Sequence, residues 1–469
     1  MKKFGIILSA LTVAFTSCIK VDIDNSSVDS GNGNGVYATK QAEILATKVI
    51  TGVINDGENV ELPKGIYTLK GYVYVNGRAS IKFAPGSVIK SDTVQKGALI
   101  IERNSKIFAC GTATEPIVFT SGKPAGSRKP GDWGGIVILG NAPTNRTTTP
   151  IIEGGINAEY GGSVATDNSG SLCYVRIEYA GIAADPNSEI NGLTLGGVGS
   201  GTSINYVQVS YGNDDAYEFF GGTVNAKYLI AFATADDDYD FDFGYNGRLQ
   251  FGVALRDPLF VDAGDAGNGV ECDNDATGSN ATPYTKPSIS NFTWVGPNDA
   301  PGTLANHNFN MRWRRATQFD VRNSVLMGYM DAGLSLESDS TGSFYKTGKS
   351  AFANNLVHAV TNPYRVPSSG GVPAVNPSII DAAAMKTKAE SEGCITYSSS
   401  ADISLTDPFK LNAPNFLPKA GSPALSGAAF TGTGWTGVSF WTTTTFRGAF
   451  GADNWMSGWA SFTPQTNVY

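Results

Sequence analysis

The sequence predicts an all-β protein, a right-handed, single-stranded parallel β-helix with about 22 residues per coil and a cap at each end. Three observations favour this solenoid. The 469 residues include 56 glycines, 11 % are aromatic and only 16 % are charged, which is typical of many short strands joined by turns. Strand-like segments recur along the chain, and a second set of segments repeats between them, as stacked coils require.

The first set of segments has alternating apolar positions. Tyr206 and Tyr228 are 22 residues apart, and Tyr228 and Gln250 are again 22 apart. Tyr174 precedes Tyr206 by 32 residues, which indicates one longer loop. The members are CYVRIEYAG (173–181), NYVQVSYGN (205–213), KYLIAFATA (227–235), LQFGVALRD (249–257), SNFTWVGP (290–297) and FDVRNSVLMG (319–328).

The second set contains short strands with two apolar columns. Side chains two residues apart share one face of a strand, so both columns should point into the core. The apolar columns are Leu193, Tyr217, Tyr239, Val270, Phe309, Leu334 and Leu195, Phe219, Phe241, Cys272, Met311, Leu336. The polar columns, expected to face outward, are Thr194, Glu218, Asp240, Glu271, Asn310, Ser335 and Gly196, Phe220, Asp242, Asp273, Arg312, Glu337.

The stretch ADDDYDFDFGYNG (235–247) belongs to this second set. Its alternation turns Tyr239 and Phe241 inward and turns Asp240 and Asp242 outward. Coils stack about 4.8 Å apart, so carboxylates from neighbouring coils share a patch and repel one another unless a cation compensates. Turn acids add to the same end of the patch: Asp214, Asp215, Asp236, Asp237 and Asp238.

This acidic patch predicts a calcium site, because calcium prefers six to eight oxygen ligands. An alternative is a solvated acidic face that Arg312 and Arg314 partly neutralise. The sequence has no contiguous calcium-binding loop of the EF-hand type. The expected metal ligands are Glu218, Asp240, Asp242, Glu271 and Asp273, with Asn310 nearby.

Catalysis on a polysaccharide is a second hypothesis. Two carboxylates can cleave a glycosidic bond, and Asp240 with Glu271 is the candidate pair. Alternatively, calcium acidifies a uronate and an arginine removes the proton, with Arg248, Arg256 or Arg312 as the base. The only two histidines, His307 and His358, lie in no context typical of a catalytic triad or a zinc site.

A non-catalytic surface protein that binds glycan or another ligand is the third and favoured hypothesis, because enzyme motifs are missing. FNMRWRR (309–315) places an aromatic ring among three arginines, and arginines bind carboxylates or sulfates bidentately. Arg312, Arg314 and Asn310 are the candidate ligand-binding residues. The alternation also allows Trp313 to point inward as a core residue. A third alternative is an adhesin or structural surface protein.

The first residues, MKKFGIILSALTVAFTSC, predict a lipoprotein signal peptide over 1–17. Two lysines precede an apolar run that is too short to span a bilayer. The small residues before Cys18 resemble a bacterial lipobox, so we expect a lipid anchor on Cys18. The alternative is an ordinary secretory signal. Asp22 and Asp24 resemble the acidic export signal of surface lipoproteins, which implies an outer-membrane protein exposed at the cell surface.

The remaining chain divides into three parts. Residues 18–36 are polar and rich in Gly, Asn and Ser, and should form a flexible tether. Residues 37–425 should form the β-helix, with 41–54 as an amphipathic N-terminal cap. Residues 426–469 lack the repeat and are expected to be a C-terminal cap or a docking segment.

Charge and cysteines add further limits. A net charge of −8 and a pI near 5 argue against nucleic acid as a partner. Cys272 is expected to be a buried core residue. The spacing of Cys110, Cys173 and Cys394 does not show whether they pair.

Several stretches together resemble a family of exported, right-handed β-helix lipoproteins of Bacteroidota. They are GALIIERNSKIFACGTATEPIVFTS (97–121), GDWGGIVILGNAP (131–143), YVRIEYAG (174–181), INGLTLGGVGSGTSINYVQVSYGNDDAYEFFGGTVNAKYLIA (190–231) and FRGAFGADNWMSGWASFTP (446–464). The resemblance implies the fold and the location. The wider superfamily includes pectate-lyase-like and polygalacturonase-like enzymes.

The chain departs from the polygalacturonase-like pattern. Asp-rich motifs at 213–215 and 236–238 echo two of its motifs, but the Gly-His-Gly and Arg-Ile-Lys motifs are missing. The expected partners are therefore a polysaccharide or other extracellular ligand and the outer membrane, with an outer-membrane transporter as an alternative.

Overall fold

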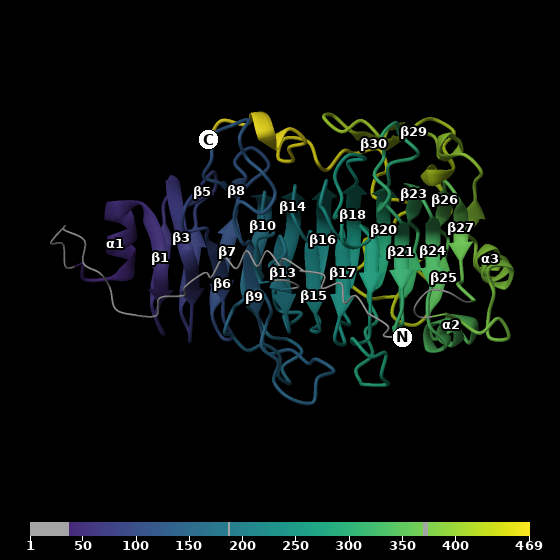
Figure 1. Cartoon of the computed structure of the whole chain (residues 1–469), viewed down its shortest axis with the longest axis horizontal. Coiled ribbons are helices and arrows are strands. Elements are labelled where there is room, and N and C mark those ends of the chain that lie inside the picture. Colours follow the sequence, from purple (N-terminus) through teal and green to yellow (C-terminus); the bar gives the residue numbers. More distant parts are fainter. Residues whose placement is uncertain (1–36, 186–187, 369–373) are drawn as a thin grey trace, which may run out of the picture. The chain divides into compact units, whose positions relative to one another are not determined.

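The computed structural model describes residues 37–185, 188–368 and 374–469. The expected signal peptide (1–17), tether (18–36) and lipidated Cys18 lie outside the described residues. In the described part, 26 strands pair into one continuous, almost entirely parallel system that winds around a shared core (Figure 1). The predicted parallel β-helix is confirmed.

Each coil contributes strands to three rows, which we call sheets 1, 2 and 3. Sheet 1 runs through the second half of β3 (Ile66–Val75), β6 (Ala98–Ile101), β9 (Ile136–Leu139), β13 (Leu193–Gly196), β15 (Tyr217–Phe220), β17 (Tyr239–Asp242), β19 (Val270–Cys272), β21 (Phe309–Trp313), β24 (Ala332–Leu336) and β27 (Asn362–Arg365). Strands of sheet 1 appear side by side across Figure 1.

Long strands join sheets 2 and 3. Sheet 2 contains β2 (Asn59–Leu62), β4 (Ser80–Phe83), β7 (Lys106–Cys110), the first halves of β10 (Gly170–Glu178), β14 (Ser203–Ser210), β16 (Asn225–Phe232), β18 (Arg248–Leu255) and β20 (Ser288–Val295), then β22 (Asp320–Arg322) and β25 (Ala351–Ala353). Sheet 3 contains β1 (Val49–Ile54), β5 (Val88–Ser91), β8 (Ile117–Ser121), the second halves of the same long strands, β23 (Val325–Tyr329), β26 (Leu356–Ala359) and β28 (Ile395–Thr396).

The corner between sheets 2 and 3 is a single residue in the left-handed conformation. Its φ is 56° at Tyr206, 60° at Tyr228, 63° at Phe251 and 57° at Asn291. Tyr174, Tyr206, Tyr228 and Phe251 stack their rings from coil to coil, with centroids 4.3 to 5.1 Å apart. Aromatic stacking thus stabilises a corner whose backbone most residues avoid.

The expected spacing needs one correction at this corner. Tyr228 lies above Phe251, 23 residues later, because Lys227 pairs with Gln250 and Leu229 with Gly252. The predicted match of Tyr228 with Gln250 is therefore wrong by one residue. The interval of 22 residues holds between Ser203 and Asn225, whereas other coils are longer because their loops are longer.

Short helices cover both ends of the stack. At the first coil, α1 (Lys40–Thr47) buries Ile44, and Thr39 caps it by accepting from the Ala42 amide. The predicted cap at 41–54 is thus helical only to Thr47, because Val49–Ile54 forms β1. At the other end, α3 (Ala382–Ser391) lies beside β27 (Figure 1) and buries two side chains, Met385 and Ala389.

The other elements are peripheral. They are β11 (Ala183–Asp185), β12 (Ser188–Glu189), β29 (Leu405–Asp407), β30 (Asn415–Pro418), α2 (Asp339–Lys346) and 3₁₀ helices at Ser400–Ile403, Pro423–Leu425 and Pro464–Thr466. Cys110 and Cys173 form a disulfide between β7 and β10, and Cys272 and Cys394 are free and buried. Cys272 is therefore a core residue, as predicted. In the residues described, no helix combines the length and apolar composition needed to cross a membrane.

The segment 426–469 lies along one side of the coils and does not close their end. It contacts earlier coils in turn: Ala429 donates to Asn323, Ser461 to Gln208, and Tyr469 to Glu178 (Figure 1). Its buried Trp459 meets the rings of Tyr174 and Tyr206 edge-on. The segment takes this path because its aromatic side chains cover the aromatic stack at the corner.

Candidate functional site

The outward column of sheet 1 places three carboxylates on successive strands. Glu218 of β15 pairs in register with Asp240 of β17, which pairs with Glu271 of β19. Phe220 is the partner of Asp242. The predicted stacking of Glu218, Asp240 and Glu271 is confirmed, and it makes sheet 1 the face on which to look for a site.

The register predicted farther along is wrong by two residues. Val270 pairs with Met311 and Glu271 with Arg312, so Phe309 and Asn310 lie one step outside the expected columns. A shift of two residues keeps every side chain on its face of the strand, so the apolar pattern could not detect it. Asn310 is fully buried and its amide has no hydrogen-bond partner among the described residues; it therefore lies away from any ligand surface.

The corrected register brings arginines onto two of the five expected metal ligands. Arg312 lies 3.1 Å from Glu271, which Arg314 also contacts. Arg314 and Arg315 lie 2.9 and 2.6 Å from Asp273. Arg312 and Arg365 continue the network to Glu337, at 3.3 and 2.8 Å. Glu271 and Asp273 are thus neutralised by the protein itself.

Glu218 and Asp240 behave differently, and Asp215 joins them. Carboxylate oxygens of Asp215, Glu218 and Asp240 all lie within 4.8 Å of one another, and so do those of Asp214, Asp215 and Asp236. We call these groups the first and second triads. None of the ion pairs formed between described residues includes a member of either triad. Two oxygens that bind the same calcium ion can lie up to about 5 Å apart, so both triads fit such an ion.

The turn acids of the aspartate-rich stretch have separate roles. Asp215 accepts from the Asp237 amide at 2.8 Å, and Asp237 accepts from the Asn268 amide at 2.6 Å. These bonds form a side-chain ladder that satisfies backbone donors at the turn before sheet 1. Asp238 is fully buried, 3.1 Å from the equally buried Arg256, and accepts from Tyr329 at 2.7 Å. Asp236 is left for the second triad.

Two residues near the first triad were not expected from the sequence. Asn191 is 1 % exposed and donates its amide nitrogen to Glu218. Glu153 lies on the loop between β9 and β10, and its carboxyl group is hydrogen-bonded to Glu218 and Asn191. Ile152 and Tyr160 of this loop are buried against sheet 1. No local pattern marks Glu153, because only the path of a long loop brings it to Glu218.

The second triad, by contrast, had a signal in the sequence. Asp214 precedes Asp236 by 22 residues, and Asp215 precedes Asp237 by 22, which is the length of that coil. Acids that repeat at the coil length occupy the same place on neighbouring coils. We had expected them only as turn acids.

Burial and mutual repulsion raise the pKa values of the cluster. Loss of hydration, with the carboxylates of Glu153 and Glu189, raises the pKa of Asp214 to about 8. Loss of hydration raises the pKa of Glu153 to about 7, with Glu189 acting in the same direction. Burial, reinforced by neighbouring carboxylates, also holds the pKa values of Asp215, Glu218 and Asp240 well above the usual range. A bound cation would offset both causes.

Unsatisfied oxygens also suit a cation. One oxygen each of Asp240, Asp242 and Asn191 is buried without a hydrogen-bond partner in the described part of the chain. Such groups are costly unless a water or an ion satisfies them. Carboxylate and amide oxygens are hard ligands that suit calcium, so the residues present fit calcium.

The candidate catalytic residues are constrained. Glu271 is held between Arg312 and Arg314, and Arg256 has no exposed surface and binds Asp238. Trp313 is fully buried, as are Trp133 and Trp294 to within 1 %. The aromatic ring expected among the arginines is therefore a core residue.

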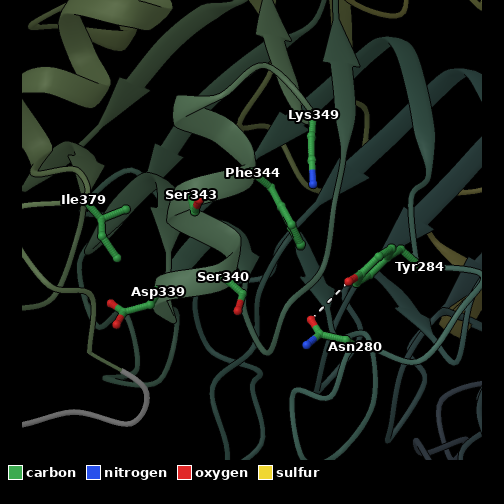
Figure 2. Close-up of a pocket in the computed structure, with 8 residues that line it drawn as sticks. All are labelled: Asn280, Tyr284, Asp339, Ser340, Ser343, Phe344, Lys349 and Ile379. Carbon is green, nitrogen blue, oxygen red and sulfur yellow. Dashed lines mark hydrogen bonds between the residues drawn. The ribbon is translucent and has the colours of Figure 1, made fainter.

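A separate shallow cavity of about 500 Å³ lies between α2 and the loop before β20. Figure 2 shows Tyr284 directed at Asn280, to which its hydroxyl donates at 3.0 Å, and Phe344 facing the same space. The other lining residues are Asp339, Ser340, Ser343, Lys349 and Ile379. The cavity contains no member of the acidic cluster.

Comparison with known proteins places the fold. Among solved structures, the crystal structure of pectate lyase Pel9A is similar at 13 % identity and a TM-score of 0.37, over 88 % of this chain and 90 % of that one. No curated protein sequence matches significantly. Residues 52–399 match the pectate-lyase-like β-helix domain, which is about three quarters of the sequence. The chain therefore belongs to the pectate-lyase-like β-helix domain family.

Proposed function

We propose that this chain is a non-catalytic surface protein that binds calcium on sheet 1 and, through the ion, an acidic glycan. The first triad carries the proposal. Asp215, Glu218 and Asp240 converge from two neighbouring coils, their oxygens lie within 4.8 Å of one another, and no arginine or lysine in the described residues pairs with them. Several buried like charges need a counter-charge, and calcium supplies it.

An acidic glycan is the ligand class that suits the rest of the face. A calcium ion held by three carboxylates retains open coordination positions for further oxygens. Next to it, the side chains of Arg312, Arg314 and Arg315 are 16, 14 and 35 % exposed. A glycan carrying carboxylates or sulfates would meet the ion first and then arginines, which bind such groups bidentately. Membership of the pectate-lyase-like family supports a polysaccharide ligand.

A non-catalytic role is favoured over a lyase or a hydrolase by the condition of the candidate groups. Glu271 is ion-paired and Arg256 is buried. Arg312, Arg314 and Arg315 all pair with carboxylates. An arginine that removes a proton must first lose its own, and neighbouring carboxylates oppose that loss. No described arginine of this network is placed to act as a base.

Calcium binding tests the proposal directly. We expect isothermal titration of the purified chain with calcium to show binding that Asp240→Asn weakens by at least about tenfold, because one of three ligand charges is lost. Asp453→Asn, an exposed aspartate outside sheet 1, should bind as the parent does. No calcium binding by the parent chain would refute the proposal.

Glycan binding is tested on immobilised neutral and acidic polysaccharides, with calcium and then with chelator. We expect retention of acidic polymers only, released intact by the chelator. Soluble fragments that require calcium and disappear in Asp240→Asn or Glu271→Gln would instead identify a calcium-dependent lyase or hydrolase. Retention without calcium would assign the glycan to a different surface.

We also propose that Cys18 carries a lipid anchor that holds the chain on the outer membrane, exposed to the medium. The support is the lipobox-like sequence before Cys18 and the two aspartates that follow it. Metabolic labelling with palmitate should label the parent and not Cys18→Ala, and only the parent should be degraded by protease added to whole cells. Labelling of Cys18→Ala would refute the anchor.

A further inference from the structure

The two triads share one residue. Asp215 belongs to the first with Glu218 and Asp240, and to the second with Asp214 and Asp236. The sharing follows from the fold. Asp215 precedes β15 on one coil, and Asp236 comes 21 residues later before β17 on the next. The backbone register that aligns β15 with β17 therefore brings both groups to one place.

We infer that the acidic cluster binds two divalent cations, one in each triad, with the Asp215 carboxylate between them. The inference rests on the proposed function for the first ion and adds a second ion, held by Asp214 and Asp236. The size of each group allows it. Calcium–oxygen distances of about 2.3–2.6 Å place two ligands of one ion up to about 5 Å apart, and the oxygens of each triad lie within 4.8 Å of one another.

Charge is the first argument for the second ion. The two triads together contain five carboxylates, so one divalent ion leaves three negative charges and two ions leave one. The arginines in this region are already committed, Arg312 and Arg314 to Glu271 and Arg256 to Asp238. Asp237 and Asp242 add negative charge close by. Like charges this near require compensation.

The Asn191 side chain is an independent sign of a ligand in the cluster. Asn191 is 1 % exposed, and its amide nitrogen donates to Glu218. Its amide oxygen has no partner in the described residues. A buried amide oxygen costs free energy when nothing satisfies it, and here the amide lies against the oxygens of the first triad. An ion or its bound water at this position would satisfy it.

The two positions differ in depth. Asp215 and Glu218 are 6 and 7 % exposed, whereas Asp214 and Asp236 are both partly exposed. The first triad therefore has two buried members and the second has one. The second ion is the more accessible to a ligand in solution, and we expect it to bind more weakly because water competes for its oxygens.

Stoichiometry tests the inference, with calcium alone as the probe. Equilibrium titration and native mass spectrometry of the parent chain should give two ions per chain. The double variant Asp214→Asn with Asp236→Asn should bind one ion, and so should Glu218→Gln with Asp240→Asn. Asp215→Asn should weaken both ions, although its amide oxygen can still accept from the Asp237 amide. Asp453→Asn serves as the matched control and should bind two.

The outcomes separate the two claims. Two ions in the parent and one in each double variant support both. One ion in the parent, unchanged by the Asp214 and Asp236 substitutions, overturns the second site and leaves the proposed function standing. No ion overturns both. Circular dichroism monitors folding of each variant, and the parent stoichiometry decides the question even when a variant fails to fold.

Discussion

At the residue scale, the aspartate-rich stretch combines four tasks within seven positions. Asp236 faces the second triad, Asp237 accepts a backbone amide, and Asp238 forms a buried ion pair with Arg256. Asp240 and Asp242 point outward on sheet 1, where Asp240 completes the first triad. Only part of the acidic charge is therefore available to an ion, and the rest stabilises the turns of the fold.

The raised pKa values of this cluster predict an unusual pH dependence. The pKa of Asp214 rises from 3.8 to about 8 on folding, and that of Glu153 rises from 4.5 to about 7. Between pH 4 and pH 8 the folded chain therefore holds more protons than the unfolded chain, and the free energy of unfolding falls as pH rises. The pKa of Asp275 is lowered to about 2, so its contribution is lost only below that window.

Thermal unfolding in chelator should therefore show a higher Tm at pH 5 than at pH 8. Saturating calcium should raise the Tm at pH 8 more than at pH 5, because the ion binds the ionised carboxylates. A Tm in chelator that increases from pH 5 to pH 8 would mean that the cluster is not the dominant titrating group.

At the element scale, contacts between equivalent positions of neighbouring coils decide which side chain fits. Gly252 lies beside Phe292 of the next coil. A Cβ atom at Gly252 would lie 2.0 Å from the Phe292 ring, whereas one at Gly264, on an exposed loop, would meet nothing nearer than 3.5 Å. The glycine thus makes room for an aromatic ring of the adjacent coil.

Gly252→Ala should destabilise the chain by about 1–3 kcal/mol or more, since it forces the core to repack. Gly264→Ala is the control and should leave stability within about 0.5 kcal/mol. Denaturant unfolding followed by tryptophan fluorescence measures both. Equal stabilities for the two variants would show that the ring of Phe292 moves aside at no cost.

At the scale of the whole described molecule, segment 426–469 joins coils that are far apart in sequence. It contacts Asn323 near its start and Glu178 at Tyr469. Trp459 is 1 % exposed and lies 5.9 and 6.0 Å from the rings of Tyr174 and Tyr206. The segment packs on the corner between sheets 2 and 3, whereas both triads belong to the turn and strands of sheet 1.

Trp459→Ala should reduce the free energy of unfolding by about 3–5 kcal/mol, the usual cost of removing a buried aromatic side chain. Calcium affinity of the folded variant should equal that of the parent, because the segment and the triads occupy different sides of the coil. Val468→Ala, at a residue 89 % exposed, provides the control. Weakened calcium binding in folded Trp459→Ala would link the segment to the site.

The sequence by itself determined the solenoid and the face of each strand. Alternation of Tyr239, Asp240, Phe241 and Asp242 is local, since backbone geometry sends successive side chains to opposite faces. Alignment over coils of equal length was also correct, as for Glu218 and Asp240. These predictions depend only on spacing within one or two coils.

Only the tertiary structure decided which coils' side chains meet. The two-residue shift of Arg312 onto Glu271 left the alternation intact, so no apolar pattern could detect it. Glu153 reaches Glu218 through a long loop, and segment 426–469 returns along the corner. Loop paths and long-range packing are set by contacts between distant residues, which local periodicity does not encode. The sequence therefore determined an acidic face, and the tertiary structure decided which of its carboxylates remain free to bind a cation.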